Sequence, residues 1–129
     1  MKKLTAIVRI GLVGEVVHSI EHAGCRCLSA VNICGLGDLV DPENPHISFE
    51  YEGHYSTMSR IEVLCADEDV DRLMSIVKSI GHTDHPGDGL VYISPVERAA
   101  KIQTGEEGER VLRAKDESLN AKSAKGTTQ

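Results

Sequence analysis

The feature that most constrains this fold is a helical pattern that occurs twice, 57 positions apart. Apolar residues spaced i, i+3, i+4 and i+7 lie on one face of a helix. The chain has two such sets: Val13, Val16, Val17 and Ile20, and then Val70, Leu73, Met74 and Val77. Gly24 and Gly81 follow them, where a left-handed residue commonly ends a helix. The repeat predicts two equivalent helices packed on a common core.

Strand patterns flank both predicted helices. Residues 2–9 place Leu4, Ala6 and Val8 on one face, as in a half-buried strand. Three further short apolar runs cover residues 26–36, 59–66 and 90–94. Each half of the chain therefore reads βαβ, which predicts a ferredoxin-like α+β fold, with two helices on one face of a four-stranded antiparallel sheet. Asp67 is expected to cap the second helix at its start.

A long polar segment, residues 37–57, separates the two halves. It contains two prolines and many Asp, Glu, Asn, Gly and Ser residues. A loop of this length inside a compact domain is usually functional or disordered. We expect one domain over residues 1–112 that includes this loop. Residues 113–129, with Leu119 as their large apolar residue, are expected to form a disordered polar tail.

Composition narrows the function classes. Trp is absent and aromatic residues make up 3%, so the core must be aliphatic. The net charge of −6, with no basic stripe among aromatics, argues against nucleic acid as a partner. No apolar run approaches the roughly 20 residues of a membrane helix, and Arg9 interrupts the N-terminal run, which makes a poor signal peptide. We expect a cytoplasmic protein, not inserted in the membrane, with reduced cysteines.

Two glycine motifs are candidates for binding. Gly87-Asp88-Gly89 lies between a helix and a strand, where glycines allow a backbone to approach a phosphate and successive N–H groups can hold an anion. A plain turn explains the same tripeptide. Gly35 and Gly37 flank the start of the long loop, where they would suit a hinge or a simple exit from the strand.

Five segments in register resemble the PII signalling family over residues 1 to about 112. They are Met1 to Val8, Gly35-Leu36-Gly37, Arg60-Ile61-Glu62-Val63, Gly87-Asp88-Gly89 and Thr104-Gly105-Glu106-Glu107. The resemblance implies a homotrimer, without catalytic residues, that needs no cofactor. Clefts between its subunits would bind adenine nucleotides as effectors. The loop 37–57 would be the T-loop that docks on a partner, a membrane transporter or an enzyme, and such a partner could recruit the protein to the inner face of the membrane.

The resemblance also assigns nucleotide-binding residues. Residues 82–89 would be the B-loop, and residues 95–105 the C-loop that reaches the nucleotide of the next subunit. The implied set is Ser29, Gly35, Gly37, Asp38, Glu62, Leu64, Thr83, Gly87, Asp88, Gly89, Leu90, Lys101 and Gln103. Tyr51 stands where enterobacterial members carry a modifiable tyrosine, but its neighbours differ, so we expect an unmodified loop aromatic.

The departures from the family pattern lie on the phosphate side. Leu90 replaces a lysine, Lys101 and Gln103 replace two arginines, and Asp38 and Leu39 replace Arg-Gln. Hydrogen bonds to charged groups contribute about 1.5–3 kcal/mol each, so losing two weakens triphosphate binding about 100-fold or more. We therefore expect ADP, AMP or cyclic AMP to be preferred over ATP. The family uses the Gln at position 39 to hold the Mg²⁺ that bridges ATP and 2-oxoglutarate, and Leu has no ligand atom. The usual 2-oxoglutarate response should be absent or rebuilt, which moves the expected role away from the family's usual nitrogen sensing. The resemblance to divergent PII-like proteins implies control of inorganic-carbon (bicarbonate) uptake, metal efflux or another transporter, with a role in nitrogen metabolism left open.

The alternative is a metal- or redox-sensing protein of the same fold. Cys25 and Cys27 should point to opposite faces of a strand, while Cys34 and Cys65 should be buried as small hydrophobic residues. The remaining candidates are His18 and His22 on an exposed helix face and four loop residues, His46, His54, His82 and His85. A nucleotide-hydrolysing enzyme ranks last, because no general base can be singled out.

Overall fold

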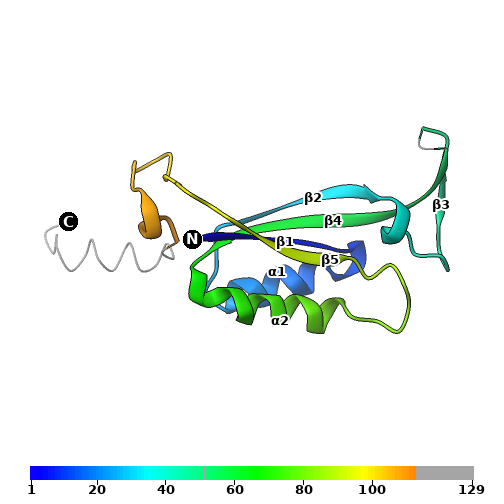
Figure 1. Ribbon diagram of the computed structural model, residues 1–129, viewed down its shortest axis with the longest axis horizontal. Helices are drawn as coiled ribbons and strands as arrows, with labels where there is room; N and C mark the ends of the chain where they lie inside the picture. The colour runs from blue at the N-terminus through cyan, green and yellow to red at the C-terminus, as the bar shows by residue number, and fades with distance from the viewer. Residues whose placement is uncertain (51, 113–129) are drawn as a thin grey trace, which may run out of the picture.

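The computed structural model describes residues 1–50 and 52–112. Within them the elements are β1 (Lys2–Arg9), α1 (Val13–His22), β2 (Leu28–Gly35), β3 (His46–Ser48), β4 (Gly53–Cys65), α2 (Val70–Gly81) and β5 (Leu90–Pro95). Short 3₁₀ turns cover Ile10–Leu12, Gly37–Leu39, Asp67–Asp69 and Gly108–Leu112. The antiparallel sheet has the order β2-β4-β1-β5, and β3 pairs with β4 beyond it. Both helices lie on one face of the sheet (Figure 1), which confirms the ferredoxin-like α+β fold.

The core lies between the two helices and the sheet and is aliphatic, as the composition predicts. Leu4 and Ala6 of β1, Ile20 of α1 and Leu73 of α2 are completely buried. Val13, Val17, Val70 and Met74 pack around them. The two helical faces read from the sequence are therefore the faces that meet the sheet.

The long segment between the two halves is more ordered than the sequence indicates. β4 begins at Gly53, several residues before the predicted strand at 59–66, and β3 pairs with its first residues through Ile47 opposite His54. The interpretation of residues 37–57 as one irregular loop is wrong in this respect, because part of the loop is a hairpin that extends the sheet (Figure 1).

Three local predictions also need correction. Asp67 does not cap α2, because its carboxylate accepts a hydrogen bond from the Met1 ammonium at 2.9 Å and the N-cap of the helix is Asp69, without a side-chain cap bond. Gly81 has no left-handed conformation, whereas Gly24 does, with φ of 98°. Cys34 is exposed rather than buried, because it lies near the end of an edge strand.

Other expectations are confirmed or fall outside the described part. Cys25 is buried and Cys27 is exposed, so the two thiols do differ, and Cys65 is buried. Strand alternation is not the reason for this difference, because Cys25 and Cys27 precede β2 and residues i and i+2 of a strand share a face. His18 and His22 are both exposed. None of the helices in residues 1–50 and 52–112 is long and apolar enough to cross a membrane. The predictions for Tyr51 and for the tail at residues 113–129 lie outside the described residues.

Candidate functional site

The short loop between α2 and β5 is organised by the Asp88 carboxylate. Thr83 donates its hydroxyl to Oδ1 at 2.5 Å and its backbone N–H to Oδ2 at 2.8 Å. Partial burial opposes the ionisation of Asp88, but these bonds, together with the Arg9 guanidinium, hold the pKa of the carboxyl below its usual value. The loop is thus closed by a carboxylate both of whose oxygens accept hydrogen bonds from Thr83.

Two glycines of this loop are required by close backbone contacts. Gly87 has φ of 93°, and a Cβ atom there would lie 2.8 Å from the Cα of Asp41 in the long loop. Gly89 has φ of 103° and packs on the backbone of β1. The glycines therefore have a structural reason to be present, and Gly87 brings the short loop against the base of the long loop.

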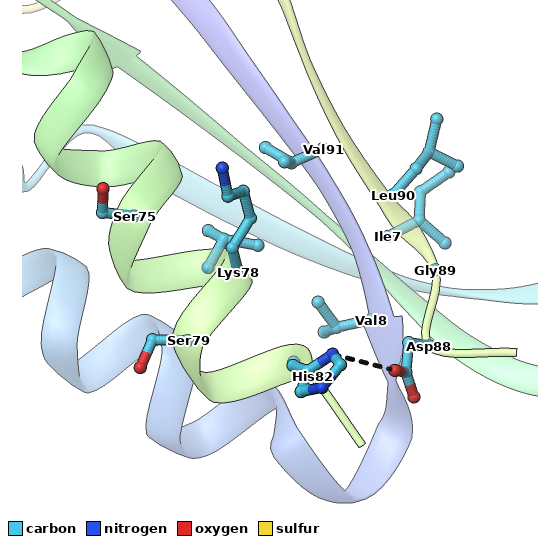
Figure 2. Close-up of a pocket in the computed structure, with 12 residues that line it drawn as sticks. Ile7, Val8, Ser75, Lys78, Ser79, His82, Asp88, Gly89, Leu90 and Val91 are labelled. Atoms are coloured by element: carbon cyan, nitrogen blue, oxygen red, sulfur yellow. Dashed lines mark ion pairs between the residues drawn. The ribbon is translucent and has the colours of Figure 1, made fainter. Parts of the chain in front are cut away.

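A groove of about 710 Å³ runs between α2 and the beginning of β5. Ile7, Val8, Leu90 and Val91 form much of its apolar lining, and Asp88 and Gly89 lie at one end. Figure 2 shows Ser75, Lys78, Ser79 and His82 along the helical side, with His82 paired to Asp88 at 4.0 Å. Its size and its few polar groups are those of a small-molecule site.

Sequence reasoning missed the positive charge beside this groove. Lys78 lines the groove, but on the sequence it is one more polar residue on the outer side of an amphipathic helix. Arg9, at the end of β1, pairs with Asp41 of the long loop and with Asp88 of the short loop. The hydrogen bond with Asp41 raises the pKa of Arg9. Backbone donation from Glu43 and the bond from Arg9 lower the pKa of Asp41.

The predicted nucleotide-binding residues form two groups in one copy of the chain. One group lies where β1 ends: Gly35, Gly37, Asp38, Thr83, Gly87, Asp88, Gly89 and Leu90. The other lies toward the beginning of β1 or beyond β5: Ser29, Glu62, Leu64, Lys101 and Gln103. Gly35 and Ser29 sit on the same strand, six residues or about 20 Å apart at 3.3 Å per residue. A single copy does not bring the two groups together.

Comparison with known proteins identifies the family. The family model described as "Nitrogen regulatory protein P-II" matches residues 1–106. The chain belongs to this family. The "Nitrogen regulatory protein P-II" of Cereibacter sphaeroides is 35% identical over 109 residues, which cover 84% of this chain and 97% of that protein. The "Nitrogen regulatory protein P-II 2" of Methanothermobacter thermautotrophicus is 30% identical over 112 residues, covering 87% and 97%.

A relative named for nitrogen fixation is also similar. The "Nitrogen fixation nifHD region GlnB-like protein 1" of Methanothermococcus thermolithotrophicus is 33% identical over 110 residues, which cover 84% of this chain and 99% of that protein. The resemblance noted in the sequence is thereby confirmed as PII membership, and with it a nitrogen-regulatory signalling role at the level of the family.

The described residues give little support to the hypothesis of a metal- or redox-sensing protein. Within residues 1–50 and 52–112, no three His, Cys, Asp or Glu side chains gather as metal ligands. Burial, with a smaller contribution from Cys25, raises the pKa of the Cys65 thiol to about 11. Burial likewise raises the pKa of Cys25. The thiolate is the reactive form of cysteine, so these two residues are better suited to the core than to redox chemistry.

Proposed function

We propose that this PII protein is a signalling regulator that binds adenine nucleotides in clefts between the subunits of a homotrimer. The observation that supports this most is the division of the nucleotide-binding positions into two groups on one chain. Gly87 and Gly89 of the short loop lie beside the end of β1, while Ser29 and Glu62 pair on β2 and β4 farther along the sheet. A second copy that presents its Ser29 side to the glycine side of the first would complete the site.

The preferred effector is ADP, AMP or cyclic AMP rather than ATP. Leu90, 47% exposed, occupies the place beside the glycines where the family carries a lysine, and it offers no hydrogen bond to a phosphate. Lys101 remains as a cation on the opposite side of the cleft, and Lys78 lines the groove. Two lysines in these places suit one or two phosphates better than three.

The long loop is the output element in this proposal. In the β3–β4 hairpin, Ile47 is 72% exposed to solvent and Phe49 is 94% exposed. Exposed apolar side chains at the end of a hairpin suit contact with another protein, because burying them releases water from apolar surface. The partner would be a membrane transporter or an enzyme of nitrogen or inorganic-carbon metabolism. The protein would then act in the cytoplasm, and a membrane partner would recruit it to the inner face of the membrane.

Calorimetry with the full chain tests this function. ATP, ADP, AMP and cyclic AMP are titrated separately, each with and without Mg²⁺ and 2-oxoglutarate or bicarbonate, and light scattering gives the mass of the assembly. We expect a trimer that binds at least one of ADP, AMP and cyclic AMP more tightly than ATP. Tight Mg-ATP binding that 2-oxoglutarate strengthens would overturn the interpretation of Leu39, Leu90 and Gln103. A monomer that binds none of the nucleotides would overturn the proposed function itself.

A further inference from the structure

Arg9 holds the base of the long loop against the short loop. Its Nη1 donates to Asp41 Oδ2 at 2.5 Å, its Nη2 to the Pro86 carbonyl oxygen at 2.9 Å and its Nε to Asp88 Oδ1 at 3.2 Å. The Arg9 side chain is 23% exposed and that of Asp41 is 17% exposed, so solvent screens this contact only in part. All three guanidinium nitrogens are engaged, and the acceptors come from both loops.

The two carboxylates that share Arg9 are held in different ways. Asp88 also accepts two hydrogen bonds from Thr83, within the short loop. The second oxygen of Asp41 accepts the N–H of Glu43 at 2.9 Å, within the long loop. A competitor for Arg9 could therefore displace the Asp41 carboxylate while the turn formed by Thr83 and Asp88 stays closed. Such a displacement would break an ion pair between the two loops.

A phosphate can bind Arg9 only by competing with the carboxylates that already neutralise it. Next to Gly87 and Gly89 a phosphate would meet Arg9 together with two carboxylates. A pocket of about 220 Å³ adjoins the contact and is lined by Arg9, Asp41 and Gly87 among others. Three histidines also face this place: His46 lines the pocket, His82 lies 4.0 Å from Asp88, and the Nδ1 of His85 lies 3.3 Å from an oxygen of Glu43. Each histidine is positive only when protonated, so Arg9 is the permanent cation among the described residues of this cluster.

We propose that Arg9 is a phosphate-binding residue of this protein and that Asp41 occupies it in the ligand-free state. The phosphate end of a nucleotide at Gly87 and Gly89 displaces the Asp41 carboxylate from Arg9 and thereby releases the base of the long loop. This inference rests on the proposed nucleotide binding and adds the residue that couples it to the loop. Because binding linkage is reciprocal, weakening the Arg9–Asp41 contact must strengthen ligand binding by the same factor by which the ligand loosens the loop.

Asp41→Asn tests the inference, because the amide keeps an oxygen for the Glu43 N–H and removes the charge that competes for Arg9. Asp71→Asn is the matched control, since it removes the same charge from an exposed position of α2, outside both loops. ADP is titrated into wild type and both variants, and amide hydrogen exchange is followed over residues 38–48. Arg9→Lys is a second probe of the loop, because a lysine keeps the charge but loses the planar fork that bridges several acceptors.

We expect Asp41→Asn to bind ADP about 10-fold more tightly than wild type, and Asp71→Asn to match wild type. Exchange over residues 38–48 should be fast in ligand-free Asp41→Asn and Arg9→Lys, and in wild type only after ADP is added. Equal ADP affinity in all three proteins, or slower exchange in wild type with ADP, would overturn the inference and leave nucleotide binding intact. Failure of all three proteins to bind ADP, AMP or cyclic AMP would instead remove the proposed function, and the inference with it.

Discussion

Gly89 lies so close to β1 that a Cβ atom on it would stand 1.8 Å from the carbonyl oxygen of Ile7. Neither atom can move away easily, because Ile7 belongs to a central strand paired on both sides and Leu90, next to Gly89, pairs directly with Ile7. The short loop is thereby fixed against the end of the sheet. Any ligand at Gly87 and Gly89 meets a backbone that is already positioned.

Gly89→Ala should destabilise the protein by more than about 2 kcal/mol, because it adds this clash to a backbone conformation that disfavours a side chain. Urea unfolding at fixed protein concentration measures the change. Gly14→Ala is the control, since a Cβ atom there meets nothing within 4 Å and the residue lies within α1. It should stabilise the helix by about 0.5–1 kcal/mol. Similar effects of the two substitutions would show that the contact with Ile7 is not as close as described.

Leu90→Lys should raise the affinity for ATP by about 10-fold or more, since one hydrogen bond from a charged group contributes about 1.5–3 kcal/mol. The affinity for ADP should rise less if the lysine contacts the third phosphate, which ADP lacks. Calorimetry with both nucleotides measures the change, and Leu90→Met serves as a neutral variant of similar volume. If Leu90→Lys leaves ATP binding as weak as Leu90→Met does, the lost lysine does not explain the predicted preference for ADP.

The pH dependence of stability should reflect Asp88. The folded protein holds its pKa below 3.8, so its contribution to stability is complete above about pH 4 and is lost as the pH falls through the folded value. Asp88→Asn should therefore lower the free energy of unfolding at pH 7, and the difference from wild type should shrink below pH 4. Urea unfolding at several pH values measures this. An Asp88→Asn deficit that grows at low pH would contradict the assignment.

Much of the fold can be predicted because its signals are local. The faces that contain Val16 and Leu73 follow helical spacing within one segment, and the alternation of Leu4, Ala6 and Val8 gives β1 its bounds. The hairpin at His46–Ser48 carries no such signal, since its pairing with the start of β4 is decided by contact between segments. In the sequence Asp67 has the pattern of an N-cap. In the structure its carboxylate instead accepts a hydrogen bond from the Met1 ammonium, 66 positions away, which no local pattern predicts.

The candidate site was predictable only in part for the same reason. Gly87 and Gly89 can be recognised in the sequence, because two glycines in a short loop indicate positive φ values or close backbone contacts. The sequence could not show which backbone they approach. Arg9 and Asp41 are 32 positions apart and lie in segments with no local pattern that links them. Their ion pair exists because the fold brings the end of β1 beside the long loop.

The central claim, that the nucleotide site is completed between copies, can be tested by mixing subunits. Leu90→Glu should damage one side of the cleft and Lys101→Glu the other, so each variant alone should bind ADP at least about 10-fold more weakly than wild type. In oligomers assembled from both variants, some clefts combine an unaltered Leu90 with an unaltered Lys101. The account predicts that calorimetry recovers tight ADP binding at part of these sites. Mixed assemblies that bind no better than either variant alone would contradict it.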